Sequence, residues 1–154
     1  MTTDELYFEL SDGPNSVRVE IIEKINYNST LDWDKNWLKT NVKVKAGAFS
    51  GQFSVDFMTV DFENFKHELT RIYSDLKGCI RFENLDRNLE LVFRGDGNGH
   101  FNIEVVAKES NEVEKNELTF HIYIDQTQIK PLVNQVDKIV SAFPIIGDLK
   151  IKNK

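Results

Sequence analysis

The sequence predicts an α+β fold of about eight mainly antiparallel strands in one or two sheets, with two amphipathic helices. Several segments alternate apolar and polar residues, which is typical of strands with one buried and one solvated face. Two longer segments carry apolar stripes with the 3.6-residue period of a helix. Since parallel strands usually read as continuous apolar runs, the alternation favours antiparallel pairing. The order of the segments is ββββα followed by ββββα.

The length of 154 residues suits one domain with a substantial core. No linker or low-complexity segment divides the chain. We therefore expect a single domain over residues 1–154, with its core at about 5–143 and a C-terminal tail at 144–154.

Four strands are expected before the first helix, at residues 6–10, 17–25, 38–46 and 49–57. The alternation is clearest in the last two. In the fourth strand the residues of the buried parity are Phe49, Gly51, Phe53, Val55 and Phe57.

The first helix is expected to begin at Asp61 and to end at Gly78. The Asp61 carboxylate would cap the first turn, and Val60 and Phe65 would close a hydrophobic staple. The apolar stripe that would face the core is Phe62, Phe65, Leu69, Ile72, Tyr73 and Leu76.

The second half repeats this order, with strands expected at 79–84, 89–93, 101–107 and 118–124. The segment "RGDGNGH" (94–100) supplies glycines for a tight hairpin turn. The final helix would begin after a cap at Asp125 or Thr127. Because proline is best tolerated in the first helical turn, Pro131 favours the later start.

Composition limits the function. The net charge of −6 argues against nucleic acid, whose affinity comes largely from Lys and Arg. The N-terminus lacks the features of a signal peptide, no apolar run is long enough to span a membrane, and Cys79 is the single cysteine. We therefore expect a cytoplasmic protein without disulfides. No histidine or cysteine spacing suggests a metal site, so we expect no enzyme, cofactor or metal.

The stretch "DWDKNWL" (32–38) contains the only tryptophans, Trp33 and Trp37. It begins like a calcium-binding loop, but Trp37 replaces the glycine of the sixth position and Lys43 the glutamate of the twelfth. A helical turn capped by Asp32 is the better interpretation, with both indoles on one side. The indoles would then either cover one end of the core or contact a partner or ligand.

Two charged surfaces are also candidates. Lys39, Lys43 and Lys45 form a basic stripe, which a solvated strand face or a lysine-protected edge explains. The loop at 108–117 concentrates Glu109, Glu112, Glu114 and Glu117. It is either a solvated hairpin loop or a surface that steers a basic partner.

Four segments together resemble the WapI family of bacterial immunity proteins: "DWDKNWLKTNVKVKAGAFSGQFSVDF", "FENFKHELTRIYSDLKGCIRF", "LELVFRGDGNGHFNIEV" and "LTFHIYIDQTQIKPLVNQVDKI". In such systems a cell-surface protein delivers a C-terminal toxin domain, often a nuclease, into neighbouring cells. The resemblance implies a small cytosolic protein that binds and occludes this toxin domain without catalysis.

The sequence therefore predicts a protein-binding module whose partner is a toxin domain, expected to be basic, and neither nucleic acid nor a membrane. The oligomeric state stays open. The expected contact residues are Asp32, Trp33, Asp34, Glu109, Glu112 and Glu114. The alternative is a β-sandwich that binds a small ligand or carbohydrate at the Trp33/Trp37 turn.

Overall fold

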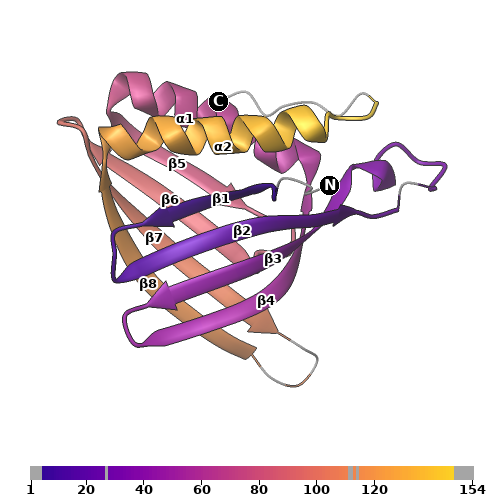
Figure 1. The fold of residues 1–154 in the computed structure, drawn as a ribbon, viewed down its shortest axis with the longest axis horizontal. Helices are drawn as coiled ribbons and strands as arrows, with labels where there is room; N and C mark the ends of the chain where they lie inside the picture. The colour runs from indigo at the N-terminus through magenta and orange to yellow at the C-terminus, as the bar shows by residue number, and fades with distance from the viewer. Residues whose placement is uncertain (1–4, 27, 111–112, 114, 148–154) are drawn as a thin grey trace.

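A computed structural model describes residues 5–26, 28–110, 113 and 115–147. Two antiparallel sheets of four strands and two helices follow one another in the order ββββαββββα, which confirms the predicted fold class (Figure 1). The first half comprises β1 (Tyr7–Ser11), β2 (Asn15–Lys24), β3 (Trp37–Ala46), β4 (Phe49–Met58) and α1 (Thr59–Asp75). The second comprises β5 (Lys77–Glu83), β6 (Leu89–Asp96), β7 (His100–Ser110), β8 (Lys115–Asp125) and α2 (Gln126–Ala142).

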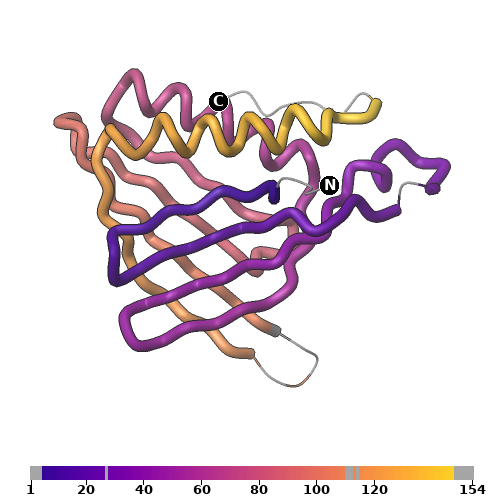
Figure 2. The backbone as a smooth tube through the Cα atoms, in the orientation of Figure 1, coloured from indigo at the N-terminus to yellow at the C-terminus, as the bar shows by residue number. Residues whose placement is uncertain are grey.

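The two sheets lie face to face with their strands crossing, and both helices lie along one border of the pair (Figure 1). Each sheet keeps its strands in sequence order, β1-β2-β3-β4 and β5-β6-β7-β8. The helices pack against each other, α1 also against β5 and α2 against β1. The path of the chain shows that neither helix reaches the opposite border, where β3 turns into β4 (Figure 2).

Phenylalanines from both halves of the chain form the centre of the core. Phe82 of β5 stacks on Phe57 of β4 at 4.9 Å and on Phe65 of α1 at 4.4 Å between ring centroids. Phe8 of β1 meets Phe82 edge-on at 5.3 Å. Each of these rings is almost wholly buried. Because they come from both sheets and a helix, this cluster joins the two halves into one core.

The first helix is shifted from the predicted position. It begins at Thr59, and the Asp61 carboxylate accepts a hydrogen bond of 2.8 Å from the Met58 backbone N–H, inside the first turn. The predicted Asp61 cap is therefore wrong, although the residue still satisfies an end group. The predicted end at Gly78 is also wrong: the helix ends at Asp75, because Leu76 adopts a left-handed conformation at φ 60°.

The second helix starts earlier than Pro131 suggested. Asp125 is the cap, and its carboxylate accepts hydrogen bonds from the backbone N–H and the hydroxyl of Thr127. The amide of Gln128 accepts in return from the Asp125 N–H at 3.3 Å. The favoured start at Thr127 is therefore wrong. The reciprocal bonds stabilise the earlier start and leave Pro131 inside the helix.

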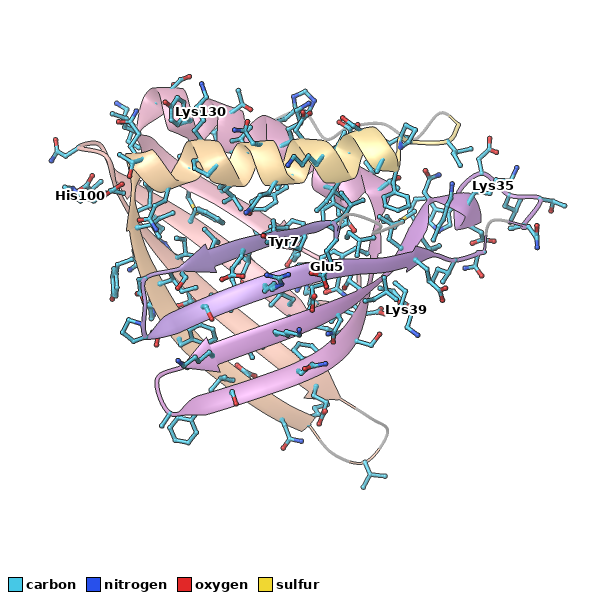
Figure 3. The ribbon with its side chains drawn as sticks, in the orientation of Figure 1. Glu5, Tyr7, Lys35, Lys39, His100 and Lys130 are labelled. Atoms are coloured by element: carbon cyan, nitrogen blue, oxygen red, sulfur yellow. The ribbon has the colours of Figure 1, made fainter. Side chains whose placement is uncertain are left out.

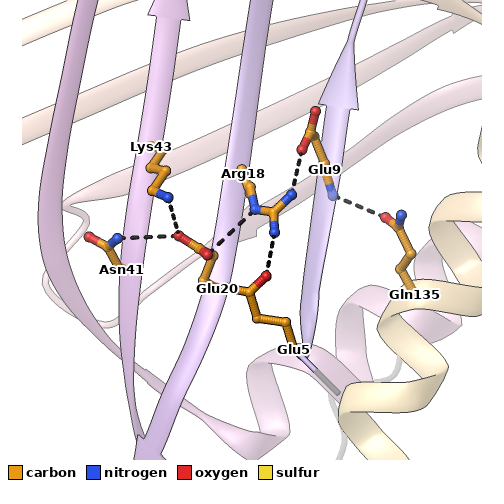
Figure 4. A network of polar contacts seen from close by, with 7 residues as sticks. All are labelled: Glu5, Glu9, Arg18, Glu20, Asn41, Lys43 and Gln135. Atoms are coloured by element: carbon orange, nitrogen blue, oxygen red, sulfur yellow. Dashed lines mark hydrogen bonds and ion pairs between the residues drawn. The ribbon is translucent and has the colours of Figure 1, made fainter. Parts of the chain in front are cut away.

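A polar network covers the outer face of the first sheet (Figure 4). The guanidinium of Arg18 lies 3.1 Å from the carboxylates of Glu5 and Glu9 and 3.6 Å from that of Glu20. It also lies 3.6 Å above the centre of the Tyr7 ring. Arg18 thus joins the N-terminal segment to β1 and β2.

Glu20 is buried within this network, at 5% exposure. Its carboxylate lies 2.9 Å from the Lys43 ammonium. Lys39, Lys43 and Lys45 are all exposed on the outer face of β3, so the predicted lysine stripe is a solvated strand face; it does not protect an edge, because β3 lies inside the sheet. The hydrogen bond from Lys43 lowers the pKa of the Glu20 carboxyl, and the charge of Arg18 acts in the same direction, whereas burial opposes both.

We predict that Glu20 makes folding sensitive to acid. Because its pKa is lower in the folded state, the ionised carboxylate stabilises the fold at neutral pH. This contribution is lost as the pH falls through the unfolded glutamate value of about 4.3 and on through the lower pKa of the folded state. Urea unfolding across this range should show a smaller loss of stability for Glu20→Gln than for the wild type. Parallel curves would contradict the assignment.

Candidate functional site

The connection between β2 and β3 extends past the end of the first sheet (Figure 1). We call residues 28–37 the Trp33 turn. It contains a short 3-10 helix, Asp34–Asn36, so the predicted helical turn is present. Asp32 does not cap it as predicted, because the Asp34 N–H bonds to the carbonyl of Leu31 at 3.1 Å. The Asp34 carboxylate instead accepts a 3.2 Å hydrogen bond from the Ser29 hydroxyl.

Asn36 anchors the Trp33 turn to two distant segments. Its side chain is fully buried, and its amide donates to the carbonyls of Asp32 at 2.6 Å and Ile146 at 2.9 Å. Its carbonyl oxygen accepts from the Ile146 N–H at 2.8 Å and the Thr59 hydroxyl at 2.9 Å. A Cβ on Gly147 would lie 2.6 Å from an Asp32 carboxylate oxygen, so the chain after α2 passes close against the turn.

The two tryptophans have different environments. Trp37, at the start of β3, is half-buried, whereas Trp33 is 47% exposed. Of the two roles left open for the indoles, covering the core therefore does not hold for Trp33. Leu31 is 62% exposed beside it, and Asp32 is also exposed. Because Trp is enriched among the residues that dominate binding energy at protein interfaces, the exposed Trp33 makes this turn a candidate contact surface. Lys35, on the same turn, points outward (Figure 3) and lies 3.7 Å from the Asp32 carboxylate.

The acidic candidates lie elsewhere. Glu109 is exposed near the end of β7, and its carboxylate accepts a 3.2 Å hydrogen bond from the Asn116 amide. Glu112 and Glu114 fall outside the described residues. In Figure 1 the end of β7 lies at the lower border of the molecule, whereas the connection between β2 and β3 protrudes on the right. The structure therefore groups Asp32, Trp33 and Asp34, and separates them from Glu109.

Sequence reasoning missed an apolar groove at the border that the helices leave uncovered. We call it the mouth groove; it has a volume of about 310 Å³. Phe49, Gly51 and Phe53 of β4 line one side, and Ala107 and Leu118 of the second sheet line the other. Phe49 is 71% exposed although its parity is that of the core. The alternation identified the inward face correctly, but it carries no signal for where the opposite sheet ends.

A second cavity, of about 460 Å³, lies on the outer face of the second sheet. Arg94, Asp96, His100 and Asp125 are among its lining residues. Backbone hydrogen bonds from Asn98 and His100 lower the pKa of the Asp96 carboxyl, and the bonds from Thr127 lower that of Asp125. Both carboxylates thus hold a turn or a helix end.

Few reactive groups converge in the described part of the chain. Among residues 5–26, 28–110, 113 and 115–147, no three His, Cys, Asp or Glu side chains gather closely enough to hold a metal ion. Neither tryptophan lines the two cavities above or a third one between β1 and α2. Within the same residues, no helix has the length and apolar character needed to cross a membrane.

Comparison with solved structures finds distant resemblances. The chain is 15% identical to the plant transcriptional regulator PBF-2, covering 93% of this chain and 84% of that one, with a TM-score of 0.47. For WHY1 from Arabidopsis thaliana the identity is 17%, the coverage 96% and 88%, and the TM-score 0.47. For Trypanosoma brucei MRP1/MRP2 the corresponding values are 8%, 90% and 85%, and 0.46.

Comparison of sequences identifies the family of the chain. No curated protein matches the chain significantly. The profile described as "Immunity protein WapI-like family" matches residues 8–144, from β1 through α2, and so includes the Trp33 turn and the mouth groove. The chain belongs to the WapI-like immunity protein family.

Proposed function

We propose that this protein binds a cognate toxin domain and neutralises it by stoichiometric occlusion, without catalysis, in the cytoplasm of a bacterium. The observation that carries the proposal is the family match over residues 8–144. The bonding of the polar groups supports it. Asp96 and Asp125 line one cavity, but their carboxylates are occupied by the hydrogen bonds of a turn and of a helix cap, and Glu20 lies elsewhere in an ion pair with Lys43.

The Trp33 turn is the first contact surface that we propose. Trp33 would insert as the apolar anchor, since Trp is enriched among the residues that dominate binding energy at protein interfaces, and the exposed Leu31 would add apolar contact beside it. Asp32 and Asp34 would lie at the rim of that contact. The net charge of −6 suits a basic toxin, such as a nuclease, because complementary charge raises the association rate.

Co-expression tests the proposal. The partner to use is the variable C-terminal domain of a large secreted protein encoded next to this gene. Tagged toxin domain should retain this protein through affinity and size-exclusion columns, and co-expression should restore growth that the toxin abolishes. A toxin that still kills and does not retain the protein would contradict the proposal.

We expect the acidic loop at residues 108–117 to raise the rate of association with the toxin domain. We expect the double variant Glu112→Lys, Glu114→Lys to bind the toxin domain about tenfold more slowly at 20 mM salt, on the order of the steering effects seen elsewhere. The difference should shrink at 500 mM salt, because salt screens charges beyond a few ångströms. Stopped-flow fluorescence would measure both rates. Equal rates of wild type and variant at low salt would exclude steering by this loop.

A further inference from the structure

The two sheets have four edge strands, β1, β4, β5 and β8. Other elements of the fold cover β1, β5 and β8, which keeps these edges from pairing with another chain. Side chains of α2 satisfy the outer backbone groups of β1: the Gln135 amide oxygen accepts from the Glu9 N–H at 3.0 Å, and the Gln128 amide donates to the Ser11 carbonyl at 3.1 Å. Such capping prevents an edge strand from pairing with another chain. On the other sheet, β5 lies against α1.

The edge of β8 is protected by the β1–β2 hairpin. The Asp12 carboxylate accepts from the Tyr123 N–H at 3.1 Å, and the Asn15 amide donates to the His121 carbonyl at 2.7 Å. These bonds also fix the first sheet against the second.

Within residues 5–26, 28–110, 113 and 115–147, the edge of β4 has no such protection. The strands β3 and β4 are joined by Gly47 and Ala48, so Ala46 and Phe49 form the pair that closes the hairpin. Hydrogen-bonded and non-bonded pairs then alternate, which directs the backbone N–H and C=O groups of Ser50, Gln52 and Ser54 away from β3. Within the described part of the chain, no side chain from another element bonds to the backbone of residues 49–54.

The mouth groove lies directly beside this open edge. Phe49, Gly51 and Phe53 belong to β4 and face the groove. Gly51 is not needed for a turn, because its φ is not positive and the register of β3 and β4 is regular through it. A Cβ at this position would meet only a Val44 methyl at 3.5 Å. Glycine in a regular strand is typical of a site that another backbone or a ligand approaches closely.

The rim of the mouth groove is acidic. Glu109 and Glu117 contribute to its lining. Their carboxylates accept hydrogen bonds from the Asn116 amide and the Thr119 hydroxyl, at 3.2 and 3.3 Å. Among the described residues, neither forms an ion pair with a lysine or arginine of this chain. The groove is thus complementary to a segment that carries apolar side chains next to a positive charge.

We propose that an extended segment of the toxin domain adds to the β4 edge as a fifth strand. Its backbone would pair with the outward groups of Ser50, Gln52 and Ser54. One apolar side chain would enter the mouth groove over Gly51, and a neighbouring lysine or arginine would meet Glu109 and Glu117. Main-chain pairing supplies affinity in such strand additions, and the pockets beside the edge supply specificity. This inference rests on the proposed function and names the surface and the partner segment.

Two substitutions test the strand addition. Gln52→Pro removes the outward N–H, which the β3–β4 ladder does not use, and proline is tolerated on edge strands for that reason. Gly51→Leu fills the groove from within the same strand. The matched control is Gln52→Thr, which keeps the backbone donor and a good strand former. Urea unfolding would verify that each variant is folded.

Calorimetric titration with the toxin domain is the measurement. We expect Gln52→Pro and Gly51→Leu each to raise Kd at least tenfold, and Gln52→Thr to leave Kd within twofold of the wild type. Unchanged binding by both folded variants, with tight wild-type binding, would overturn the strand addition and leave the proposed function standing. If the wild type itself does not bind, the proposed function fails instead. A wild type that sediments as a dimer, with Gln52→Pro monomeric, would assign the edge to a second copy and also overturn the proposal.

Discussion

Replacing Asn36 by alanine is expected to lower the free energy of unfolding by about 3 kcal/mol. The reason is that a fully buried amide is hydrogen-bonded to the carbonyls of Asp32 and Ile146, the Ile146 N–H and the Thr59 hydroxyl. Truncation leaves these groups without their partner in a place that water does not easily reach, and it also opens a cavity. Urea unfolding followed by tryptophan fluorescence would measure the loss.

Asn41→Ala is the matched control. Asn41 lies on the outer face of β3, and its side-chain amide donates a 3.3 Å hydrogen bond to the Glu20 carboxylate. We expect this variant to lose less than about 1 kcal/mol, the usual contribution of one partly solvated hydrogen bond. Equal losses in the two variants would contradict the role of Asn36 as the anchor of the Trp33 turn.

Replacing Trp33 by alanine is expected to raise the Kd for the toxin domain about 30-fold, which is roughly 2 kcal/mol. The expectation follows from the 47% exposure of Trp33 beside the exposed Leu31 on a protruding turn. Because the side chain lies largely outside the core, the free energy of unfolding should change by less than about 1 kcal/mol. Calorimetry gives the first quantity and urea unfolding the second.

Leu85→Ala is the control for binding. Leu85 is 65% exposed between β5 and β6, so the variant also removes an exposed apolar side chain. It should leave Kd unchanged. If Trp33→Ala destabilised the fold strongly and bound the toxin as the wild type does, Trp33 would be a structural residue and the Trp33 turn would not be a contact surface.

Strand periodicity explains why the fold could be predicted from the sequence. Val42 and Val44 are buried while Lys43 and Lys45 are exposed on the other face, as the alternation indicates. The hairpin turn at residues 94–100 could also be predicted from its glycines, and Gly97 and Gly99 both adopt positive φ in the structure. These signals are local, because each depends on the faces of one strand or the backbone of one turn.

The ends of the helices were less predictable, because several residues can satisfy the same end groups. Asp61 bonds to the Met58 N–H from inside the helix, and Asp125 caps α2 despite Pro131. Leu76 takes the left-handed position where glycine was expected. Local preferences are of the order of 1 kcal/mol at such positions, so packing of the helix against the sheets decides between neighbouring ends.

The candidate surfaces depend on contacts between distant residues. The sequence placed Trp33 and Trp37 on one turn, but only the burial of Asn36 beneath it shows how that turn is held, with Trp33 directed outward. The mouth groove depends on where two sheets diverge. It brings Gly51 of β4 close to Ala107 and Glu109 of β7, a relation that no local pattern encodes.

A titration of toxin activity tests stoichiometric occlusion most directly. A fixed amount of active toxin domain, well above Kd, would be mixed with increasing amounts of this protein, and the remaining toxin activity would be measured. Our account predicts a linear decline that reaches zero at an equimolar ratio, with recovery of active toxin after denaturation and separation. Full activity at a large excess of this protein, or permanent inactivation by a small fraction of an equivalent, would contradict it.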